Sequence, residues 1–197
     1  KVIMSDMIMN NKMFYNFLSV NETVKSTTKK TCLRFQFFIN ELNTLDNKLV
    51  EIEGICTIIS KVAEKTDYHH GEVSLVGAVV GMAQNYVGSN NLNLLEPRGA
   101  FGSRLSNGAD AASPRYIFTQ LSEVTKKIFD SRDSQLLTYL ESDGMSIEPE
   151  WFAPVIPMIL VNGTVGIGSG FSTNVLQYNP IDLCKYLNAL LDDKKAV

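Results

Sequence analysis

A tyrosine directly after an arginine is the feature of this sequence with the clearest chemical potential. Tyr116 follows Arg115 in the run Ala-Ala-Ser-Pro-Arg-Tyr-Ile-Phe. A phenol can act as a nucleophile, and a guanidinium is a permanently charged, forked donor that suits a phosphate. A free phenol is mostly protonated at neutral pH, so the pair needs a base or positive surroundings. We therefore expect phosphate chemistry here, with a half-buried packing tyrosine as the ordinary alternative.

The two histidines of the chain could supply that help. His69 and His70 stand before Gly71 and the expected start of a helix. The amides at a helix N-terminus favour anions, so a phosphate is physically reasonable there. A histidine in that place can accept the phenolic proton or donate to a phosphate oxygen. The alternative is that both histidines only cap the helix.

Basic residues are concentrated in two regions. Lys25, Lys29 and Lys30 lie in a run without acidic residues, which fits either contacts to a nucleic-acid backbone or a solvated helix face. Arg98 and Arg104 lie in a glycine- and asparagine-rich stretch that leads straight to the tyrosine. A long loop of this kind in a compact domain is usually functional or disordered. Positive charge therefore gathers around the proposed chemistry.

A glycine-rich turn follows further along the chain, where Ile167 stands between Gly166 and Gly168. An apolar side chain on a glycine-flanked turn can wedge between base pairs and kink a duplex. The alternative is a residue at the end of a strand that packs into the core. The turn also lacks the lysine that a nucleotide-binding P-loop needs.

The bulk properties describe an ordinary globular protein. The chain has 197 residues, of which 45% are hydrophobic and 20% charged, with a formal net charge of −3. The cysteines are odd in number and in no metal-ligand spacing, which is typical of reduced intracellular thiols. No apolar run is long enough to span a bilayer, so we expect no membrane partner. Because the chain begins at Lys1, we expect it to be part of something longer.

The hydrophobic pattern predicts a mainly helical chain with irregular segments between the helices. The N-terminal helices fit a helix-turn-helix arrangement. The expected segments, in order, are helices over 3–20, 29–43, 54–66 and 72–87, a loop over 88–114, a helix over 117–129, a polar linker over 131–149, short strands and turns over 151–173, and a helix over 181–191.

Several long motifs resemble the type IIA DNA topoisomerases, and in particular their eukaryotic and viral topoisomerase II branch. The likeness is strong over residues 66–180 and weak over the N-terminal third. The matching pieces stand in the family's order at similar spacings: Tyr-His-His-Gly-Glu at 68–72, Met-Ala-Gln-Asn-Tyr-Val-Gly-Ser-Asn-Asn-Leu-Asn-Leu-Leu at 82–95, Phe-Gly-Ser-Arg at 101–104, Ala-Ser-Pro-Arg-Tyr-Ile-Phe at 112–118, Glu-Pro-Glu-Trp at 148–151 and Ile-Pro-Met-Ile-Leu-Val-Asn-Gly at 156–163.

The resemblance implies an α+β, mainly helical fold. Residues 1–130 would form a winged-helix DNA-binding and cleavage domain, and residues 131–197 the incomplete start of a tower domain. Tyr116 would attack the scissile phosphate and become joined to a DNA 5′ end.

By the same resemblance, Arg115 would stabilise the charged phosphate and His70 would assist the attack. Ile167 would intercalate and bend the duplex. The remaining residues with an implied DNA-binding role are Lys25, Lys29, Lys30, His69, Arg98 and Arg104.

The implied activity is that of an ATP-hydrolysing type II topoisomerase, which passes one duplex through a transient double-strand break. Its partners would be double-stranded DNA and a second copy of the chain, because two strands need two tyrosines. The chain shows no carboxylate cluster for Mg²⁺, so its ligands are expected in a toprim domain outside this chain, with the ATP site further upstream. The expected location is intracellular: the nucleus for a cellular enzyme, the host cytoplasm or a viral factory for a viral one.

Two departures and three rivals accompany this interpretation. Ala100 stands where the family usually has glutamine, and the segment at 24–30 lacks the family's proline and glycine. A helix-turn-helix module that binds DNA without cleaving it is the main alternative. The meiotic double-strand-break protein would lack the Glu-Pro-Glu-Trp and Asn-Gly-x-x-Gly-Ile-Gly pieces. The bacterial branch usually carries His-Pro-His-Gly, which makes it a weaker match.

Overall fold

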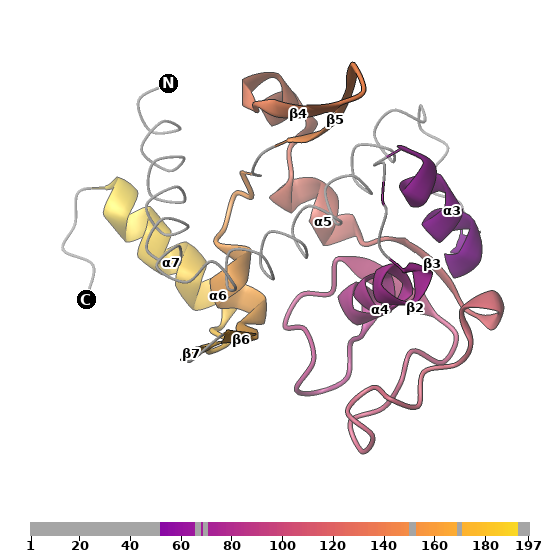
Figure 1. The fold of residues 1–197 in the computed structure, drawn as a ribbon. Helices are drawn as coiled ribbons and strands as arrows, with labels where there is room; N and C mark the ends of the chain where they lie inside the picture. The colour runs from indigo at the N-terminus through magenta and orange to yellow at the C-terminus, as the bar shows by residue number, and fades with distance from the viewer. Residues whose placement is uncertain (1–51, 66–67, 69–70, 150–152, 169–170, 193–197) are drawn as a thin grey trace. The chain divides into compact units, whose positions relative to one another are not determined.

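The structure is a computed structural model that describes residues 52–65, 68, 71–149, 153–168 and 171–192. These residues belong to two compact units, which divide between residues 152 and 153 (Figure 1). Each unit is described by itself. The predicted helices over 3–20 and 29–43 lie outside the described residues, and so do Lys25, Lys29 and Lys30.

The first unit is built on a small antiparallel sheet with the strand order β1-β3-β2. Its strands are β1 (Glu53–Gly54), β2 (Leu95–Arg98) and β3 (Phe118–Leu121). The central strand, β3, pairs on one edge with β1 and on the other with β2. The β2–β3 register runs from Leu95 opposite Leu121 to Arg98 opposite Phe118.

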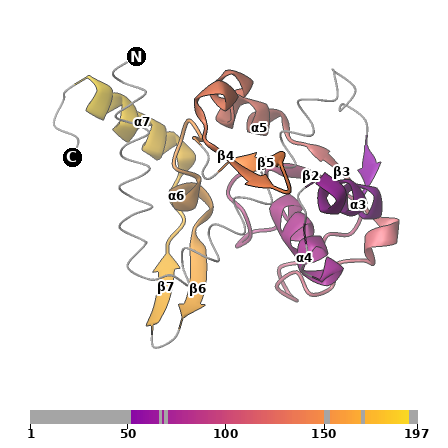
Figure 2. The same cartoon turned by 45° about the horizontal axis from the view of Figure 1, so that its top comes forward.

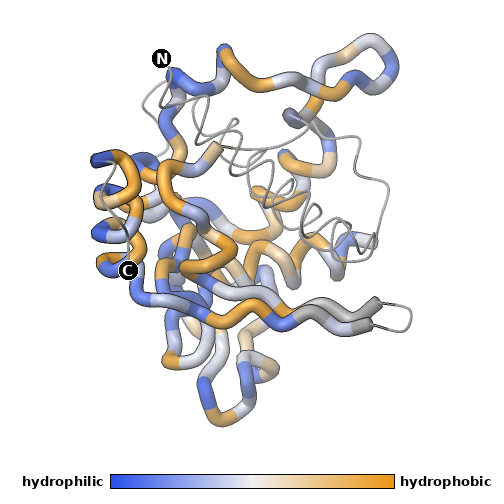
Figure 3. The backbone as a smooth tube through the Cα atoms, turned by 90° about the vertical axis from the view of Figure 1, so that its left-hand side faces the viewer, coloured by the Kyte–Doolittle hydropathy of each residue, from blue (hydrophilic) through white to orange (hydrophobic). Residues whose placement is uncertain are grey.

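Two helices pack with this sheet. Helix α3 (Ile55–Lys65) buries Ile55, Ile58, Ile59 and Val62, whose spacing places them on one helix face. Helix α4 (Glu72–Ala83) contacts both α3 and β2. Hydrophobic and hydrophilic stretches alternate along the described chain (Figure 3), as amphipathic elements require.

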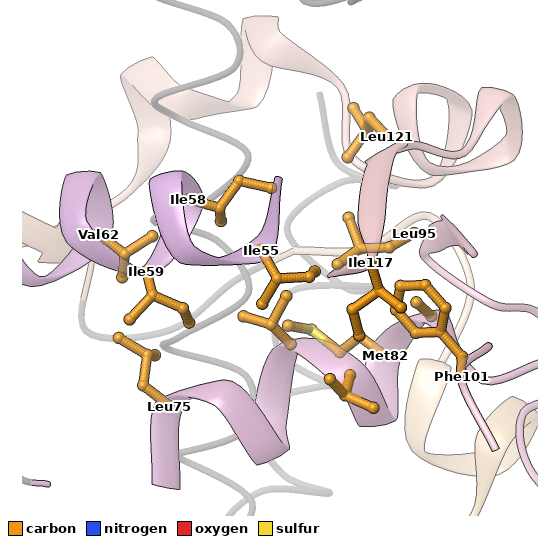
Figure 4. Close-up of a cluster of buried hydrophobic side chains, with 13 residues drawn as sticks. Ile55, Ile58, Ile59, Val62, Leu75, Met82, Leu95, Phe101, Ile117 and Leu121 are labelled. Carbon is orange, nitrogen blue, oxygen red and sulfur yellow. The ribbon is translucent and has the colours of Figure 1, made fainter. Parts of the chain in front are cut away.

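The core joins residues far apart in the sequence. Side chains from α3, from α4 and from the sheet with its loop meet in one cluster (Figure 4). Burying such side chains contributes about 25 cal/mol per Å² of apolar surface removed from water, which makes this cluster the main support of the unit. Its labelled members are Ile55, Ile58, Ile59, Val62, Leu75, Met82, Leu95, Phe101, Ile117 and Leu121.

The remaining elements of the first unit are short. They are the 3-10 helix η1 (Pro114–Tyr116) before β3 and, after β3, α5 (Glu123–Ile128), the 3-10 helix η2 (Ser131–Leu136) and a hairpin of β4 (Tyr139–Ser142) and β5 (Met145–Pro149). The hairpin turns at Asp143 and Gly144, with φ of 49° and 77°. An Asp-Gly pair with positive φ at both residues suits a tight hairpin turn.

The second unit contains α6 (Met158–Asn162), the hairpin strands β6 (Thr164–Gly168) and β7 (Phe171–Val175), and α7 (Pro180–Leu191). Figure 2 shows β6 and β7 side by side, and their register runs from Thr164 opposite Val175 to Gly168 opposite Phe171. Helix α7 begins at Pro180, and the Asn179 side chain caps it by accepting from the Ile181 amide at 2.9 Å.

The structure confirms the α+β content and corrects several predicted elements. The helices expected over 54–66 and 181–191 are present. The helix expected over 72–87 ends at Ala83, because the chain at Gln84 turns to an extended ψ of 130°. The segments expected as a loop and a linker contain β2 and the β4–β5 hairpin respectively. The helix expected over 117–129 is confirmed only in its second half by α5, because β3 occupies its first half.

The predicted mixture of short strands and turns over 151–173 also holds α6. Within the described parts of the chain, no helix has the length and apolar character to cross a membrane. The predicted domain boundary between residues 130 and 131 stays a prediction.

Candidate functional site

Tyr116 is exposed to solvent at a well-defined point of the backbone. It is the last residue of η1, its amide donates to the Ser113 carbonyl at 2.9 Å, and 69% of its surface is accessible. Pro114, whose ring presets a helical φ, occupies the first turn of η1. The alternative of a half-buried packing tyrosine therefore does not describe this residue. A large polar-tipped ring held in solvent can meet a ligand that arrives from outside.

The next residue fixes where Tyr116 stands. Ile117 is 1% exposed and lies in the core cluster beside Phe101 and Met82 (Figure 4). Its carbonyl accepts a hydrogen bond from the Ile55 amide at 3.1 Å, at the point where α3 begins. Ile117 has an extended backbone directly after η1, so its burial fixes the position of the chain next to Tyr116.

Arg115 is also exposed and stands within η1, which contacts α3 and β1. Arg98 ends β2, opposite Phe118 of β3, so it lies close along the sheet to the segment that follows Tyr116. Its guanidinium pairs with the Glu96 carboxylate at 2.9 Å, and its side chain is 50% exposed. An exposed pair of this kind contributes about 0–1 kcal/mol, so a phosphate can replace Glu96 as the partner.

The loop between β2 and η1 carries Arg104 and is folded tightly on itself. Figure 1 shows it as a long excursion of irregular chain between β2 and β3. A Cβ added to Gly102 would lie 2.6 Å from the Gly108 Cα, so only glycine permits this approach. The Ser103 amide donates to an Asp110 carboxylate oxygen at 2.7 Å. Hydrogen bonds from the Ser103 side chain and backbone hold the pKa of Asp110 below its ordinary value.

The base of this loop is tied to the end of α4. The Gln84 side-chain amide donates to the Phe101 carbonyl at 2.9 Å, and its oxygen accepts from the Tyr86 hydroxyl at 3.4 Å. Within the loop, the Ala112 amide donates to the Ala100 carbonyl at 2.9 Å. The sequence motif that contains Gln84 pointed to the family but to no role for this residue. The one available sign of a role was that Gln84 is a polar residue directly after the apolar stripe of α4.

Several predicted site residues are not placed beside Tyr116. His69 and His70 lie outside the described residues, as do the three lysines of the N-terminal basic run. Glu72, two positions after His70, opens α4 and is exposed. Ile167 belongs to the other unit, where the backbone of β6 pairs it with Ser172 of β7. The predicted roles of these residues stay predictions.

The part of the chain that the structure describes offers no set of metal ligands. No group of three or more His, Cys, Asp or Glu side chains there has an arrangement that could hold a metal ion. The described residues therefore do not fit a resident metal, and no step of the chemistry below is assigned to one.

Comparison with known proteins gives consistent results. The family model for the A subunits of DNA gyrase and topoisomerase IV matches residues 34–197. The chain is 52% identical over 141 residues to DNA topoisomerase 2 of Candida albicans, a match covering 72% of this chain and 10% of the relative. It is 54% identical over 141 residues to DNA topoisomerase 2 of Bombyx mori, covering 72% of this chain and 9% of the relative. The chain thus spans about a tenth of the length of these curated relatives.

A solved structure matches as well. The DNA-binding, cleavage and re-ligation domain of Plasmodium falciparum topoisomerase II superposes with a TM-score of 0.79 at 39% sequence identity. The match covers 85% of this chain and 22% of that one.

Proposed function

The chain belongs to the family of the DNA gyrase and topoisomerase IV A subunits, and from that premise we propose that it is the part of a type II DNA topoisomerase that carries the cleavage tyrosine. The observation that carries the proposal is the geometry of Tyr116. This residue is 69% exposed, follows Arg115, and is anchored by a neighbour buried in the core. The relatives named DNA topoisomerase 2 and the matching cleavage and re-ligation domain support it.

The reaction is a transesterification. The Tyr116 phenolic oxygen attacks the scissile phosphorus, a bond forms between them, and the bond from phosphorus to the DNA 3′ oxygen breaks. The phenolic proton leaves to a base, and the departing 3′ oxygen takes up a proton to become a hydroxyl. The product is a 5′-phosphotyrosyl link, and attack by the 3′ hydroxyl reverses the step. Bond energy is retained, so resealing needs no external energy source.

Each predicted site residue has a defined role in this proposal. Arg115 binds the phosphate oxygens that gain charge in the transition state. His70 accepts the phenolic proton. Arg98 and Arg104 hold the DNA backbone near the sheet and the loop, and contacts of this kind give affinity without sequence information.

The remaining DNA contacts come from elsewhere in the chain. His69, Lys25, Lys29 and Lys30 add contacts to phosphates, and Ile167 enters the duplex from the β6–β7 hairpin.

The fold supports a finer architecture. We assign the unit of α3, α4 and the β1-β3-β2 sheet to a winged-helix domain, with β2, β3 and the long loop as its wing. The described residues after 130 would begin a tower domain. In the complete protein, Mg²⁺ ligands in a toprim domain and an ATP site lie outside this chain. The Mg²⁺ ion would supply charge stabilisation for phosphoryl transfer.

We further propose that the working protein is a homodimer acting on double-stranded DNA inside the cell. The nucleus is its place if it is a cellular enzyme, and the host cytoplasm or a viral factory if it is viral.

The first prediction tests the nucleophile in the full-length protein. A duplex labelled at its 3′ ends is incubated with the protein and Mg²⁺, and the reaction is quenched with denaturant. Wild type is expected to become covalently attached to the newly cut DNA 5′ ends, and Tyr116→Phe to lose all attachment because the attacking oxygen is gone. Tyr186→Phe, at a half-exposed tyrosine on α7, is the matched control and is expected to attach normally. Wild type that binds DNA without attachment would favour the non-cleaving helix-turn-helix module.

A further inference from the structure

We propose that Gln84, hydrogen-bonded to Phe101 and Tyr86 and given room by Gly108, is a positioning residue that sets the cleavage rate at Tyr116. The inference rests on the proposed function, because it assigns a role within that reaction. Three observations carry it: the hydrogen bonds of the Gln84 amide, the closure of the loop that leads to Tyr116, and the absence of a side chain at Gly108.

Both ends of the Gln84 side-chain amide have partners. The nitrogen donates to the Phe101 carbonyl at 2.9 Å, and the oxygen accepts from the Tyr86 hydroxyl at 3.4 Å. The Gln84 backbone is held as well, since its carbonyl accepts from the Asn90 side-chain amide at 2.8 Å. The Phe101 carbonyl can only accept, so it fixes which end of the amide faces the loop, and the Tyr86 hydroxyl donates to the other end.

The bond to Phe101 reaches Tyr116 through the closure of the loop. Phe101 is 4% exposed, so its side chain already anchors the beginning of the loop in the core. At the neighbouring residue, the Ala100 carbonyl accepts from the Ala112 amide at 2.9 Å. This hydrogen bond joins the beginning of the loop to its end. Ser113, which directly precedes η1, is the next residue after Ala112. A shift of the Phe101 backbone is therefore passed within a few residues to Tyr116.

The part of the loop that leads back to η1 also contacts Gln84 and Tyr86 directly, and we call these two hydrogen-bonded side chains the clamp. A Cβ built on Gly108 would lie 2.4 Å from the Gln84 amide nitrogen and 2.7 Å from the Tyr86 hydroxyl oxygen. The Gly108 backbone thus rests against the same two polar groups that hold Phe101. One amide at the end of α4 contacts both sides of the loop.

Helix α4 gives this clamp a connection to the rest of the proposed site. The first residue of α4, Glu72, stands two positions after His70. Gln84 directly follows the last residue of the helix, Ala83. The helix is anchored in the core by Leu75, Val79 and Ala83, which are at most 2% exposed. Helix α4 therefore begins two positions after the expected proton acceptor in the sequence and ends directly before the residue that holds the loop of the proposed nucleophile. Sites built this way hold reacting groups more closely than a free loop does.

The test uses the full-length protein and follows single-turnover cleavage of a 5′-labelled duplex at saturating protein with Mg²⁺. Gln84→Met keeps the length of the side chain but removes both hydrogen bonds. We expect its cleavage rate to fall about 10- to 100-fold, because a misplacement of about 1 Å costs that much. The dissociation constant for DNA is expected to stay that of wild type, since the phosphate-binding arginines are untouched. Gln135→Met, at an exposed glutamine in η2, is the matched control and is expected to cleave at the wild-type rate.

Tyr86→Phe is the second variant, because it removes a single hydroxyl and leaves the packing intact. Its rate is expected to fall by less than that of Gln84→Met, and it decides the question if Gln84→Met does not fold. Unchanged rates in the folded variants, beside a wild type that cleaves, would overturn the positioning role alone. So would a Gln84→Met variant whose loss lies entirely in DNA affinity. A wild type that forms no 5′ link would instead remove the proposed function, and the inference with it.

Discussion

Tyr116 and Ile117 are neighbours in the chain that occupy opposite environments, and the contrast explains the site at the residue scale. Ile117 is fully buried and hydrogen-bonded to the start of α3, whereas Tyr116 is largely in solvent. A buried isoleucine stabilises the fold by roughly 1.5–3 kcal/mol relative to an exposed one, and that energy holds the backbone of the adjacent nucleophile in place. The tyrosine itself contributes little burial, so it is free to serve a reaction.

The second prediction concerns the guanidinium of Arg115. Arg115→Ala is expected to lower the cleavage rate about 100- to 1,000-fold, the usual effect of removing one donor to a charged transition state. Arg115→Lys is expected to fall between Ala and wild type, because lysine keeps the charge but loses the forked geometry. The single-turnover cleavage assay measures both. Arg132→Ala is the control, since that arginine of η2 pairs with Asp130, the residue before η2. Equal rates for Arg115→Ala and wild type would exclude Arg115 from the chemistry.

The departure at Ala100 also has an explanation at this scale. Ala100 is exposed, and its backbone carbonyl, rather than its side chain, makes the bond that closes the loop. A backbone carbonyl is present in every residue type. The absence of the family's glutamine therefore does not remove this closure.

At the scale of elements, the loop between β2 and η1 depends on glycine where two backbones meet. Gly108 has a φ of 81°, and its neighbours leave no space for a methyl group. Gly144, in the β4–β5 turn, has a similar φ of 77° but nothing within 4 Å of an added Cβ. The pair separates the cost of the backbone conformation from the cost of the collision.

The third prediction uses that pair. Gly144→Ala is expected to lower the free energy of unfolding by about 1–2 kcal/mol, the cost of a left-handed conformation with a side chain. Gly108→Ala is expected to lower it by more, because the methyl group also displaces Gln84, and to slow cleavage as well. Urea unfolding and the cleavage assay measure the two effects. Equal unfolding costs together with equal cleavage rates would show that the contact of Gly108 with the clamp has no consequence.

The sequence predicted elements well where the signal was long and local. Helices α3 and α7 follow apolar residues at helical spacing, and α7 also has an asparagine and a proline at its start. Strands β2 and β3 are four residues each, and their pairing joins segments about twenty residues apart in the chain, so no short pattern marks them. The β4–β5 hairpin did carry a signal, the Asp143-Gly144 turn, but the surrounding acidic residues favoured a linker.

In the candidate site too, residues with a local sequence signal could be predicted, whereas contacts between distant segments could not. Arg115 and Tyr116 could be found from residue type and from the family resemblance. The clamp could not, because the contacts from Gln84 to Phe101 and Gly108 join segments separated along the chain. Such contacts depend on how the loop folds back, which local propensity does not determine.

At the scale of the whole molecule, one copy of this chain carries one proposed cleavage tyrosine, and a duplex has two strands. The matched relatives are about ten times longer than the match, so these residues span only a small part of such a protein. The proposed homodimer follows from the count of nucleophiles rather than from a surface of this chain.

The fourth prediction follows from that count. Full-length wild-type and Tyr116→Phe protomers with different tags are coexpressed, and the mixed dimer is purified through both tags. It is expected to cut only one strand of a circular duplex and to leave nicked DNA attached to the wild-type protomer. Gel analysis after denaturant quenching distinguishes nicked from linear product. Linear DNA from the mixed dimer would mean that one tyrosine serves both strands, and failure to recover any mixed species would contradict the dimer.

The position of β3 has a mechanical consequence. Tyr116 is followed within two residues by the central strand of the sheet, which is hydrogen-bonded along both edges. If a DNA end were attached to Tyr116, as proposed, tension in that DNA would be passed along the backbone to this strand. Sliding a central strand along its own axis strains the bonds of both ladders together, whereas an edge strand can peel away one bond at a time. The proposed nucleophile is thus followed directly by the strand of the sheet that is best able to resist a pull along the chain.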